Sequence, residues 1–196
     1  MSKVKIAVLV SGNGSNLQSL IDNVESGYIN GEIAVVISDR RGAYGLERAA
    51  KHGIMTVVLD KKEYGNNEGL NKGIEYVLKS MNIELVVLAG FLTILSSDIV
   101  KAFEGKILNI HPSLIPAFCG AGLYGEKVHK AALEYGVKIS GATVHYVDEG
   151  TDTGKIILQE AVPVMEDDTP ETLGARVLEV EHRILPEAIK MIIEEI

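Results

Sequence analysis

Residues 5–16 read KIAVLVSGNGSN. The apolar and β-branched run that opens this stretch is typical of a buried strand, and the serine, glycine and asparagine residues that follow it are strong turn formers. The next segment repeats apolar residues at helical spacing, with Leu17, Leu20, Ile21 and Val24 on one face. A strand, a glycine turn and a helix in this order predict the first unit of an α/β fold.

The same alternation continues along the chain. Short apolar runs predict further strands and helical spacing predicts helices between them, with strands at 33–37, 55–59, 85–88 and 106–110 and helices at 44–52, 70–81 and 97–103. Buried strands that alternate with helices call for a mostly parallel sheet with helices on both faces. The expected fold class is therefore α/β, a Rossmann-like arrangement of three layers.

The sequence follows a different pattern in the last third of the chain. Residues 138–147 and 155–164 are two longer extended runs, joined by a short loop rich in glycine and aspartate. This pattern favours an antiparallel C-terminal extension of the sheet. Thr169 and Pro170 suit the N-cap and the first position of a final helix, which we expect to run to the C-terminal end with a bend at Pro186.

Composition narrows the class of protein. The 196 residues are 46% hydrophobic and 23% charged, which fits one soluble globular domain. The net charge of -8 disfavours binding to nucleic acid, and no apolar run reaches the roughly 18 residues that a membrane helix needs. No signal peptide is recognisable, and Cys119 is the only cysteine, which excludes an internal disulfide. These features favour the cytoplasm.

The turn at residues 12–16 joins the first strand to the first helix. Free N–H groups at a helix N-terminus attract phosphate, and glycines let the phosphate approach the backbone. The G-x-G-x-x-G nucleotide fingerprint is incomplete, because Leu17 stands at the third glycine position. We interpret the turn as a phosphate site, with an unliganded strand–helix turn as the alternative.

Asp39 follows the second predicted strand, roughly where a nucleotide-binding domain places the carboxylate that contacts ribose. Arg40 and Arg41 come directly after it. Two adjacent arginines are typical of a solvated surface turn, and we favour that interpretation for Asp39.

Asn109 and His111 interrupt an apolar strand near its carboxyl end, within LNIHPSLIP at residues 108–116. Residues two apart in a strand project from the same face, and Pro112 favours the end of the strand at that point. Open α/β sheets bind ligands at carboxyl strand ends. There an amide can donate to a developing oxyanion and an imidazole can shuttle a proton, which predicts acyl-type transfer. The alternative is that Asn109 satisfies a loop and His111 caps the strand.

Asp148, Glu149 and Asp152 lie in the loop between the two late extended runs. One of these carboxylates could reach His111, orient it and favour its protonated form; an ordinary acidic hairpin loop is the alternative. A metal site built from His111, His145 and Asp152 is conceivable, but no compact metal-binding motif is present, so we expect no metal. The other histidines need no special role: His52, His129 and His182.

Taken together, these stretches resemble the phosphoribosylglycinamide formyltransferases, folate-dependent enzymes of purine synthesis. The resemblance runs from residue 5 to about residue 190. It is most specific in LNIHPSL and DEGTDTG, which are typical of folate formyltransferases as a class, and SGNGSN points to the glycinamide branch. The other matching stretches are YGLERA at 44–49, LAGF at 88–91, TVHY at 143–146 and ILQEAVPV at 157–164.

The resemblance implies roles for particular residues. Asn109, His111 and Asp152 match the family's catalytic trio, and Glu181 matches a residue on the ribose side of the substrate. The turn that holds the substrate phosphate corresponds to Gly14, Ser15 and Asn16. The folate pocket corresponds to two segments and the catalytic asparagine: Leu92, Thr93, Ile94 and Leu95, then Val147, Asp148, Glu149, Gly150 and Thr151, with Asn109.

The resemblance also implies a reaction. The amine of glycinamide ribonucleotide attacks the formyl carbon of the co-substrate 10-formyltetrahydrofolate, and Asn109 and protonated His111 stabilise the oxyanion while Asp152 favours the protonated imidazole. The reaction needs no metal. The partners are these small molecules, without nucleic acid or membrane, and the protein is expected to be a monomer or a homodimer. Residues 1–196 would form a single formyltransferase domain, with a phosphate-binding half (1–105) and a catalytic and folate-binding half (106–196).

The chain departs from the family pattern in several places. Residues 117–131 are longer and richer in glycine than the familiar run, which leaves the substrate contacts of this loop open. Asn67 stands where many relatives have an arginine, and Leu178 where some have a polar or basic residue near the phosphate. Both changes could weaken binding of an anionic group. The chain also stops at Ile196, without the tail of many relatives.

Other functions stay open at this point. A formyltetrahydrofolate hydrolase, or an enzyme that formylates a tRNA or sugar amine, would share these motifs. The hydrolases typically carry an added regulatory domain and the tRNA enzymes a basic one, and this acidic chain is too short for either. A nucleotide-binding sensor domain would use residues 12–16 and Asp39, and the incomplete glycine fingerprint argues against it.

Overall fold

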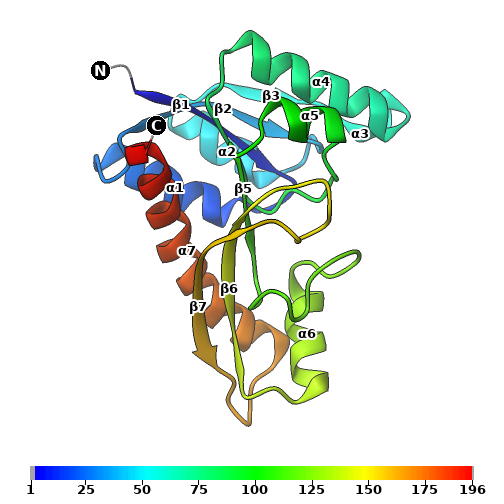
Figure 1. The fold of residues 1–196 in the computed structure, drawn as a ribbon, viewed down its shortest axis with the longest axis vertical. Coiled ribbons are helices and arrows are strands. Elements are labelled where there is room, and N and C mark those ends of the chain that lie inside the picture. The colour runs from blue at the N-terminus through cyan, green and yellow to red at the C-terminus, as the bar shows by residue number, and fades with distance from the viewer. Residues whose placement is uncertain (1–2, 196) are drawn as a thin grey trace.

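The computed structural model describes residues 3–195, which form one seven-stranded sheet flanked by helices (Figure 1). The strand order is β3-β2-β1-β4-β5-β6-β7. Strands β1 to β5 are parallel, whereas β6 is antiparallel to β5 and β7 to β6. This confirms the predicted α/β class with its antiparallel extension. The strands are β1 (Val4–Val10), β2 (Gly31–Ser38), β3 (Thr56–Val58), β4 (Leu85–Leu88), β5 (Ile107–His111), β6 (Ile139–Tyr146) and β7 (Ile156–Pro163).

Helices cover both faces of the sheet. The first and last helices pack on one face, and two helices from the middle of the chain pack on the other, as the two separate apolar cores show. The first pair is α1 (Ser15–Glu25) and α7 (Pro170–Glu195), and the second is α4 (Asn67–Ser80) and α5 (Ser97–Ala102); the others are α2 (Tyr44–Lys51), α3 (Lys61–Tyr64) and α6 (Glu126–Tyr135). Among the described residues, no helix is both long enough and apolar enough to span a membrane.

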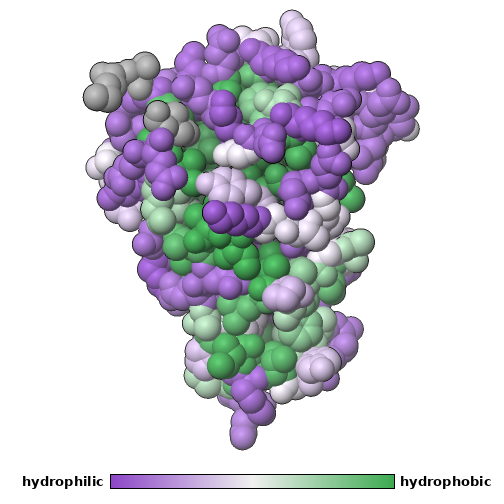
Figure 2. Space-filling model, in the orientation of Figure 1, coloured by the Kyte–Doolittle hydropathy of each residue, from purple (hydrophilic) through white to green (hydrophobic). Residues whose placement is uncertain are grey.

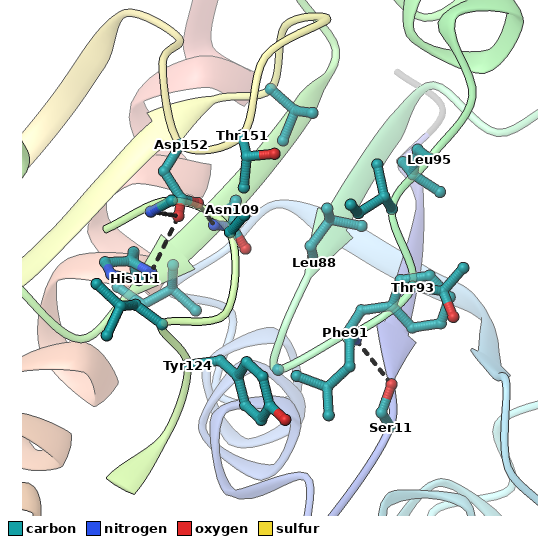
Figure 3. A pocket seen from close by; sticks show the side chains of 18 of the residues that line it. Ser11, Leu88, Phe91, Thr93, Leu95, Asn109, His111, Tyr124, Thr151 and Asp152 are labelled. Carbon is teal, nitrogen blue, oxygen red and sulfur yellow. Dashed lines mark hydrogen bonds and ion pairs between the residues drawn. The ribbon is translucent and has the colours of Figure 1, made fainter. Parts of the chain in front are cut away.

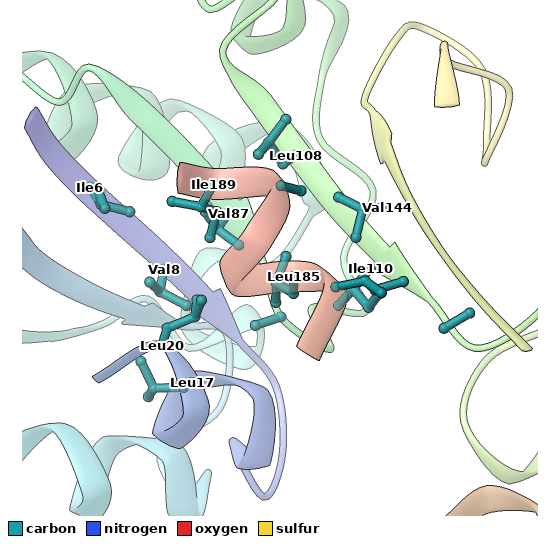
Figure 4. Packing of buried hydrophobic residues seen from close by; sticks show 14 of the residues in the cluster. Ile6, Val8, Leu17, Leu20, Val87, Leu108, Ile110, Val144, Leu185 and Ile189 are labelled. Carbon is teal, nitrogen blue, oxygen red and sulfur yellow. The ribbon is translucent and has the colours of Figure 1, made fainter. Parts of the chain in front are cut away.

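The larger core lies between the sheet and α7. Because alternate residues of a strand face opposite sides, Ile6 and Val8 of β1 point toward α1 and α7, while Leu9 joins the core under α4. Figure 4 shows Leu185 and Ile189 of α7 beside the strand residues of this core. Each such fully buried side chain stabilises the fold by about 1.5–3 kcal/mol, so α7 contributes strongly to stability.

The start of α7 follows the sequence prediction. The backbone amide of Thr169 donates to the Thr172 hydroxyl at 2.9 Å, and the Thr172 amide donates back to the Thr169 hydroxyl at 3.3 Å. This reciprocal pair satisfies two amides that a helix N-terminus leaves free. The helix then continues through Pro186 to Glu195.

The structure contains two helices, α3 and α6, that the spacing of apolar residues did not predict. Helix α6 begins at Glu126, so only residues 117–125 of the departing segment form a glycine-rich loop. Gly120, Gly122 and Gly125 all have positive φ angles. All three glycines precede α6, which is hard to recognise in the sequence because its ten residues bury only Val128, His129 and Ala132.

The outer strands β6 and β7 are covered by helices on one face only. Ala142 and Val144 join the core under α7, whereas Ile139, on the opposite face of β6, is 59% exposed. Figure 2 shows apolar side chains over the middle and lower part of this view, where β6 and β7 lie, and a mainly hydrophilic upper part. The second helical layer ends beside β5, at Ile107. The next two residues on that face of β5 are Asn109 and His111, which therefore face loops instead of helices.

Candidate functional site

A cavity of roughly 480 Å³ lies at the carboxyl ends of β1, β4 and β5 (Figure 3). Both segments that the resemblance assigned to a folate pocket, Leu92–Leu95 and Val147–Thr151, belong to its wall. Most of the wall is apolar, and its polar groups come from a few loops. The lining consists of residues 11, 12, 40, 88, 90–95, 109–112, 120–125, 145 and 147–152.

The end of β5 places two polar side chains in this cavity. Asn109 and His111 lie on the same face of the strand, opposite His145 and Thr143 of β6. The His111 ring is only 4% exposed. Its position at the strand end agrees with the expectation from the Pro112 that follows it.

The loop between β6 and β7 brings Asp152 to these side chains. Its Oδ2 atom lies 3.7 Å from Nδ1 of His111, and its Oδ1 atom accepts a long 3.4 Å hydrogen bond from the Asn109 amide. The Gly120 amide also donates to Oδ2, at 2.8 Å. The backbone of Asp152 has a φ of 57°, a conformation that aspartate adopts more readily than most residues. The three side chains expected to act together thus meet at one point.

The proton on His111 can be assigned from its second partner. Nε2 lies 3.0 Å from the carbonyl oxygen of Phe118. A carbonyl can only accept, so Nε2 carries a hydrogen and donates it. Nδ1 is then the nitrogen that faces Asp152, and it is the one that can gain or lose a proton there.

His145 orients the Asn109 amide. Its Nδ1 atom lies 2.8 Å from the carbonyl oxygen of Tyr146 and must donate to it. Nε2 accepts from the Asn109 amide at 3.0 Å when the ring is neutral, and in the protonated ring it presents a hydrogen to Oδ1 of Asp152, 3.7 Å away. Sequence reasoning considered His145 only as a metal ligand. The register of β5 against β6 was the missing information. Among residues 3–195, no group of three or more His, Cys, Asp or Glu side chains is arranged to hold a metal ion.

The charge state of Asp152 follows from its surroundings. Burial acts to raise the pKa of this carboxyl, but the His145 ring, the Gly120 amide and the charge of a protonated His111 outweigh that effect. The pKa of Asp152 is therefore lower than its ordinary value, and the group is an anion at neutral pH. This anion lies beside Nδ1 of His111, where it can attract a positive charge on the imidazole.

The glycine turn before α1 is held tightly by α2. Gly14 has a φ of 71°, and a Cβ atom built on it would lie 2.6 Å from the Cα atom of Gly45. The Gly45 amide donates to the Gly12 carbonyl at 3.1 Å, and the Arg48 guanidinium donates to the Asn13 carbonyl at 2.9 Å. The turn is thus fixed in the shape that points the first amides of α1 outward from its N-terminus.

Asn16 and Glu181 form a buried pair behind this turn. The Asn16 amide donates to the Glu181 carboxyl at 2.6 Å. Burial raises the pKa of Glu181 to about 7, and the hydrogen bond from Asn16 only partly opposes it. Among the residues assigned to the ribonucleotide side, Gly14, Ser15, Asn16 and Glu181 lie outside the cavity wall, which reaches this region through Ser11 and Gly12. The structure thus gathers the expected catalytic and folate residues at the cavity and leaves the expected ribonucleotide residues beside it.

The surface-turn interpretation of Asp39 is wrong. Its side chain is 4% exposed, and Oδ2 accepts a hydrogen bond from the Thr93 hydroxyl at 2.7 Å. The carboxylate turns inward to tie the end of β2 to the segment after β4, while Arg40 and Arg41 remain at the surface. Because Thr93 lies 54 positions from Asp39, the residues around Asp39 do not predict this hydrogen bond.

The two departures from the family pattern have different surroundings. Asn67 donates from its side-chain amide to the Ile94 carbonyl at 3.2 Å, so it supports the cavity wall from α4. Leu178 is partly buried on α7 and adds no polar group.

Comparison with known proteins gives consistent results. The formyl transferase family matches residues 4–189. The chain is 48% identical, over 97% of its length, to the trifunctional purine biosynthetic protein adenosine-3 of Gallus gallus, but it spans only 18% of the length of that protein. It is 43% identical to the chloroplastic phosphoribosylglycinamide formyltransferase of Arabidopsis thaliana, over 97% of this chain and 66% of the relative.

Solved structures show the same similarity. The glycinamide ribonucleotide transformylase 1 from Symbiobacterium toebii has a TM-score of 0.93 and 46% identity, covering 98% of this chain and 89% of that one. The phosphoribosylglycinamide formyltransferase from Bacillus halodurans has a TM-score of 0.89 and 40% identity, covering 96% and 94%.

Proposed function

Because the chain belongs to the formyl transferase family, we propose that it transfers the formyl group of 10-formyltetrahydrofolate to the amine of 5-phosphoribosylglycinamide. The products are formylglycinamide ribonucleotide and tetrahydrofolate, in the synthesis of purines. The observation that carries the proposal is the meeting of Asn109, His111 and Asp152 at one end of a largely apolar cavity. Such a cavity suits a flat, mostly apolar co-substrate, with its reactive group at the polar end.

His111 acts through Nδ1 in this proposal. The amine attacks the formyl carbon, and negative charge develops on the formyl oxygen. A protonated Nδ1 donates to that oxygen, since Nε2–H is committed to the Phe118 carbonyl. The 3.7 Å between Nδ1 and the Asp152 carboxylate exceeds a hydrogen bond, so the pair can admit the oxygen beside it while the anion faces the positive charge of the ring.

Asn109 is the second donor to the oxyanion. One of its amide hydrogens is held by His145 at 3.0 Å, and the other makes only the 3.4 Å contact with Asp152. The weaker contact is the one that an oxyanion replaces, because donors aimed at developing charge gain most in a site that excludes water. Collapse of the intermediate then releases the folate, with the proton lost by the amine passing to its leaving nitrogen through the groups in reach, His111 and Asp152.

The ribonucleotide lies on the other side of the reacting carbon. The amides of Gly14, Ser15 and Asn16 hold the phosphate at the N-terminus of α1. Glu181 binds on the ribose side, and with a pKa of about 7 its carboxyl can either donate to or accept from a hydroxyl group.

The decisive experiment is an assay of the purified protein with 10-formyltetrahydrofolate, with and without 5-phosphoribosylglycinamide. Loss of the formyl folate only when the amine is present supports the transferase. Loss without the amine supports a hydrolase instead. A change in NADH fluorescence on mixing with the protein would support a nucleotide-binding domain, and we expect none.

We further propose that residues 1–196 act as a single domain in the cytoplasm, as a monomer or a homodimer, on these small molecules alone. One sheet that runs through both the phosphate-binding half (1–105) and the catalytic and folate-binding half (106–196) supports the single domain. Light scattering on the purified protein measures the oligomeric state, and a mass of three or more chains would contradict the proposal.

A further inference from the structure

Charge is distributed unevenly around the cavity. Asp148, Glu149 and Asp152 contribute to its wall on the β6 side, and Arg40 is the only lysine or arginine in the wall among residues 3–195. Arg40 follows β2, which is three strands away from β5 in the sheet order. At about 4.8 Å per strand, these two strands are about 14 Å apart. Glu149 is paired with Lys101 at 3.1 Å, which leaves Asp148 and Asp152 to repel a ligand carboxylate at the reacting end, whereas Arg40 attracts one at the far end.

The backbone of Arg40 is held in place. The Ser38 hydroxyl accepts from the Arg40 amide at 3.2 Å and donates to the Arg40 carbonyl at 3.0 Å, and the Ala43 amide donates to the same carbonyl at 3.3 Å. Ser38 itself is fully buried. The side chain therefore starts from a fixed point at the rim of the cavity.

The guanidinium of Arg40 is nevertheless available to a ligand. Its one ion-pair contact within the described chain joins Nε to Oδ1 of Asp39 at 4.0 Å, and the side chain is 56% exposed. Asp39 is in turn fixed by its hydrogen bond to Thr93, another residue of the cavity wall. The arginine thus keeps its planar face and its terminal nitrogens free for a carboxylate, which it can bind through two parallel hydrogen bonds.

The neighbouring Arg41 differs in each of these respects. Its guanidinium pairs with Glu63 and lies 3.5 Å from Asp60, and it does not belong to the cavity wall. Arg41 provides a matched control, because it has the same side chain and a similar exposure one position away.

We propose that Arg40 binds a carboxylate of the glutamate tail of the formyl folate. This inference rests on the proposed function, which supplies the folate. With the formyl group beside His111 at the β5 end, the p-aminobenzoyl ring extends along the apolar wall and carries the tail carboxylates toward the β2 end. Arg40 thereby selects for folates that carry the tail.

The test compares Arg40→Gln, Arg40→Lys and Arg41→Gln with the unchanged protein. The substrates are 10-formyltetrahydrofolate and the carboxamide of 10-formyltetrahydropteroate, a neutral analogue in which an amide replaces the glutamate with its carboxylates; this analogue is called the pteroate below. We expect Arg40→Gln to raise the KM for the folate about tenfold, the low end for a charge-assisted contact at a partly exposed site, with kcat and the ribonucleotide KM unchanged. For the pteroate, the KM of Arg40→Gln should equal that of the unchanged protein. Arg40→Lys should be intermediate, and Arg41→Gln should have no effect.

Calorimetric titration with the same two compounds gives a readout that does not depend on turnover. The folate affinity of the unchanged protein should fall with added salt, and that of Arg40→Gln should fall less. An equal loss for folate and pteroate in Arg40→Gln, no loss at all, or a rise confined to the ribonucleotide KM would each overturn the inference. Absence of formyl transfer by the unchanged protein would instead contradict the proposed function, and the titrations would still decide whether Arg40 binds the tail.

Discussion

Nδ1 of His111 lies 3.7 Å from Oδ2 of Asp152, and the same loop holds both side chains in this position. The Phe118 carbonyl accepts from the imidazole at 3.0 Å, and the Gly120 amide donates to the carboxylate at 2.8 Å. Both anchors belong to the glycine-rich loop, residues 117–125, where the sequence departs from the family pattern. A loop at which the sequence departs from the expected family pattern therefore anchors both members of the proposed catalytic pair.

Replacement of His111 should abolish most of the activity without unfolding the protein. We expect His111→Ala to lower kcat by at least about a hundredfold, the usual scale for a lost acid–base group. Steady-state assays and circular dichroism check the two parts of this expectation. His52→Ala removes a histidine outside the cavity and should retain full turnover. Turnover by His111→Ala close to that of the unchanged protein would refute the role of the imidazole.

The coupling between Asn109 and His145 can be measured with a double-mutant cycle. Asn109→Ala should lower kcat by about a hundredfold through the lost oxyanion donor. His145→Ala should lower it less, because the amide remains but is no longer oriented. The double variant should resemble Asn109→Ala alone, since His145 acts through that amide. Strictly additive losses would show that His145 acts by another route.

Asp152→Asn tests the charge beside the imidazole. Asparagine can still accept from the Gly120 amide, so the loop keeps its anchor, but the anion that favours protonated His111 is gone. We expect the alkaline limb of the kcat profile to move to lower pH, because the ring then loses its proton more easily. A profile of kcat against pH for both proteins measures this shift. If the alkaline limbs of the two kcat profiles superimpose, the pairing of Asp152 with His111 is contradicted.

Glu181 should make the stability of the ligand-free protein depend on pH. Its pKa is about 7 in the folded protein and near 4.5 when unfolded. The folded state therefore binds the proton more tightly, and the free energy of unfolding should fall as pH rises from about 4.5 to 7 and then level off. The fall amounts to about 3 kcal/mol.

Urea denaturation at several pH values checks this expectation. Glu181→Gln cannot ionise and should lack this component of the pH dependence, whereas Glu179→Gln, at an exposed position of the same helix, should retain it. If the free energy of unfolding changes with pH in the same way in the unchanged protein and in Glu181→Gln, the raised pKa of Glu181 is contradicted.

Gly14→Ala should damage the phosphate turn in two ways. A positive φ strains any residue with a Cβ atom, by about 1–2 kcal/mol, and the new Cβ would meet the Gly45 Cα at 2.6 Å. We expect a loss of stability of about 1–3 kcal/mol and a higher KM for the ribonucleotide than for the folate. Gly27→Ala is the matched control, because it has a φ of 79° and no atom within 4 Å of the new Cβ. Equal behaviour of the two variants would show that the contact with α2 is unimportant.

The parallel part of the fold was predictable because each strand and helix carries its own periodicity. The run before Gly12 and the helical spacing after it specify β1 and α1 without tertiary information. Helix α6 is different: it has ten residues and buries only a few of them, Val128, His129 and Ala132. A pattern this short, following glycines with positive φ, does not stand out from a loop.

The parts of the candidate site that depend on a single strand could be predicted from the sequence. The parts that depend on which segments pack against each other could not. Asn109 and His111 share a face because of the two-residue period of β5 alone. That His145 lies opposite Asn109 follows from the register of β6, and the inward turn of Asp39 from a partner on another loop. Neither relationship leaves a trace in the neighbouring residues.

The position of α7 bears on how the chain acquires its fold during synthesis. Until this helix has left the ribosome, the apolar side chains of β1, β4 and β5 that it covers remain exposed to solvent, and nascent chains with such surfaces are prone to aggregate or to bind chaperones. The same helix carries Glu181. A ribosome-bound chain that lacks α7 therefore lacks both the α7 side of the larger core and the carboxyl proposed for the ribose side, so the step that covers the strands also brings Glu181 into place.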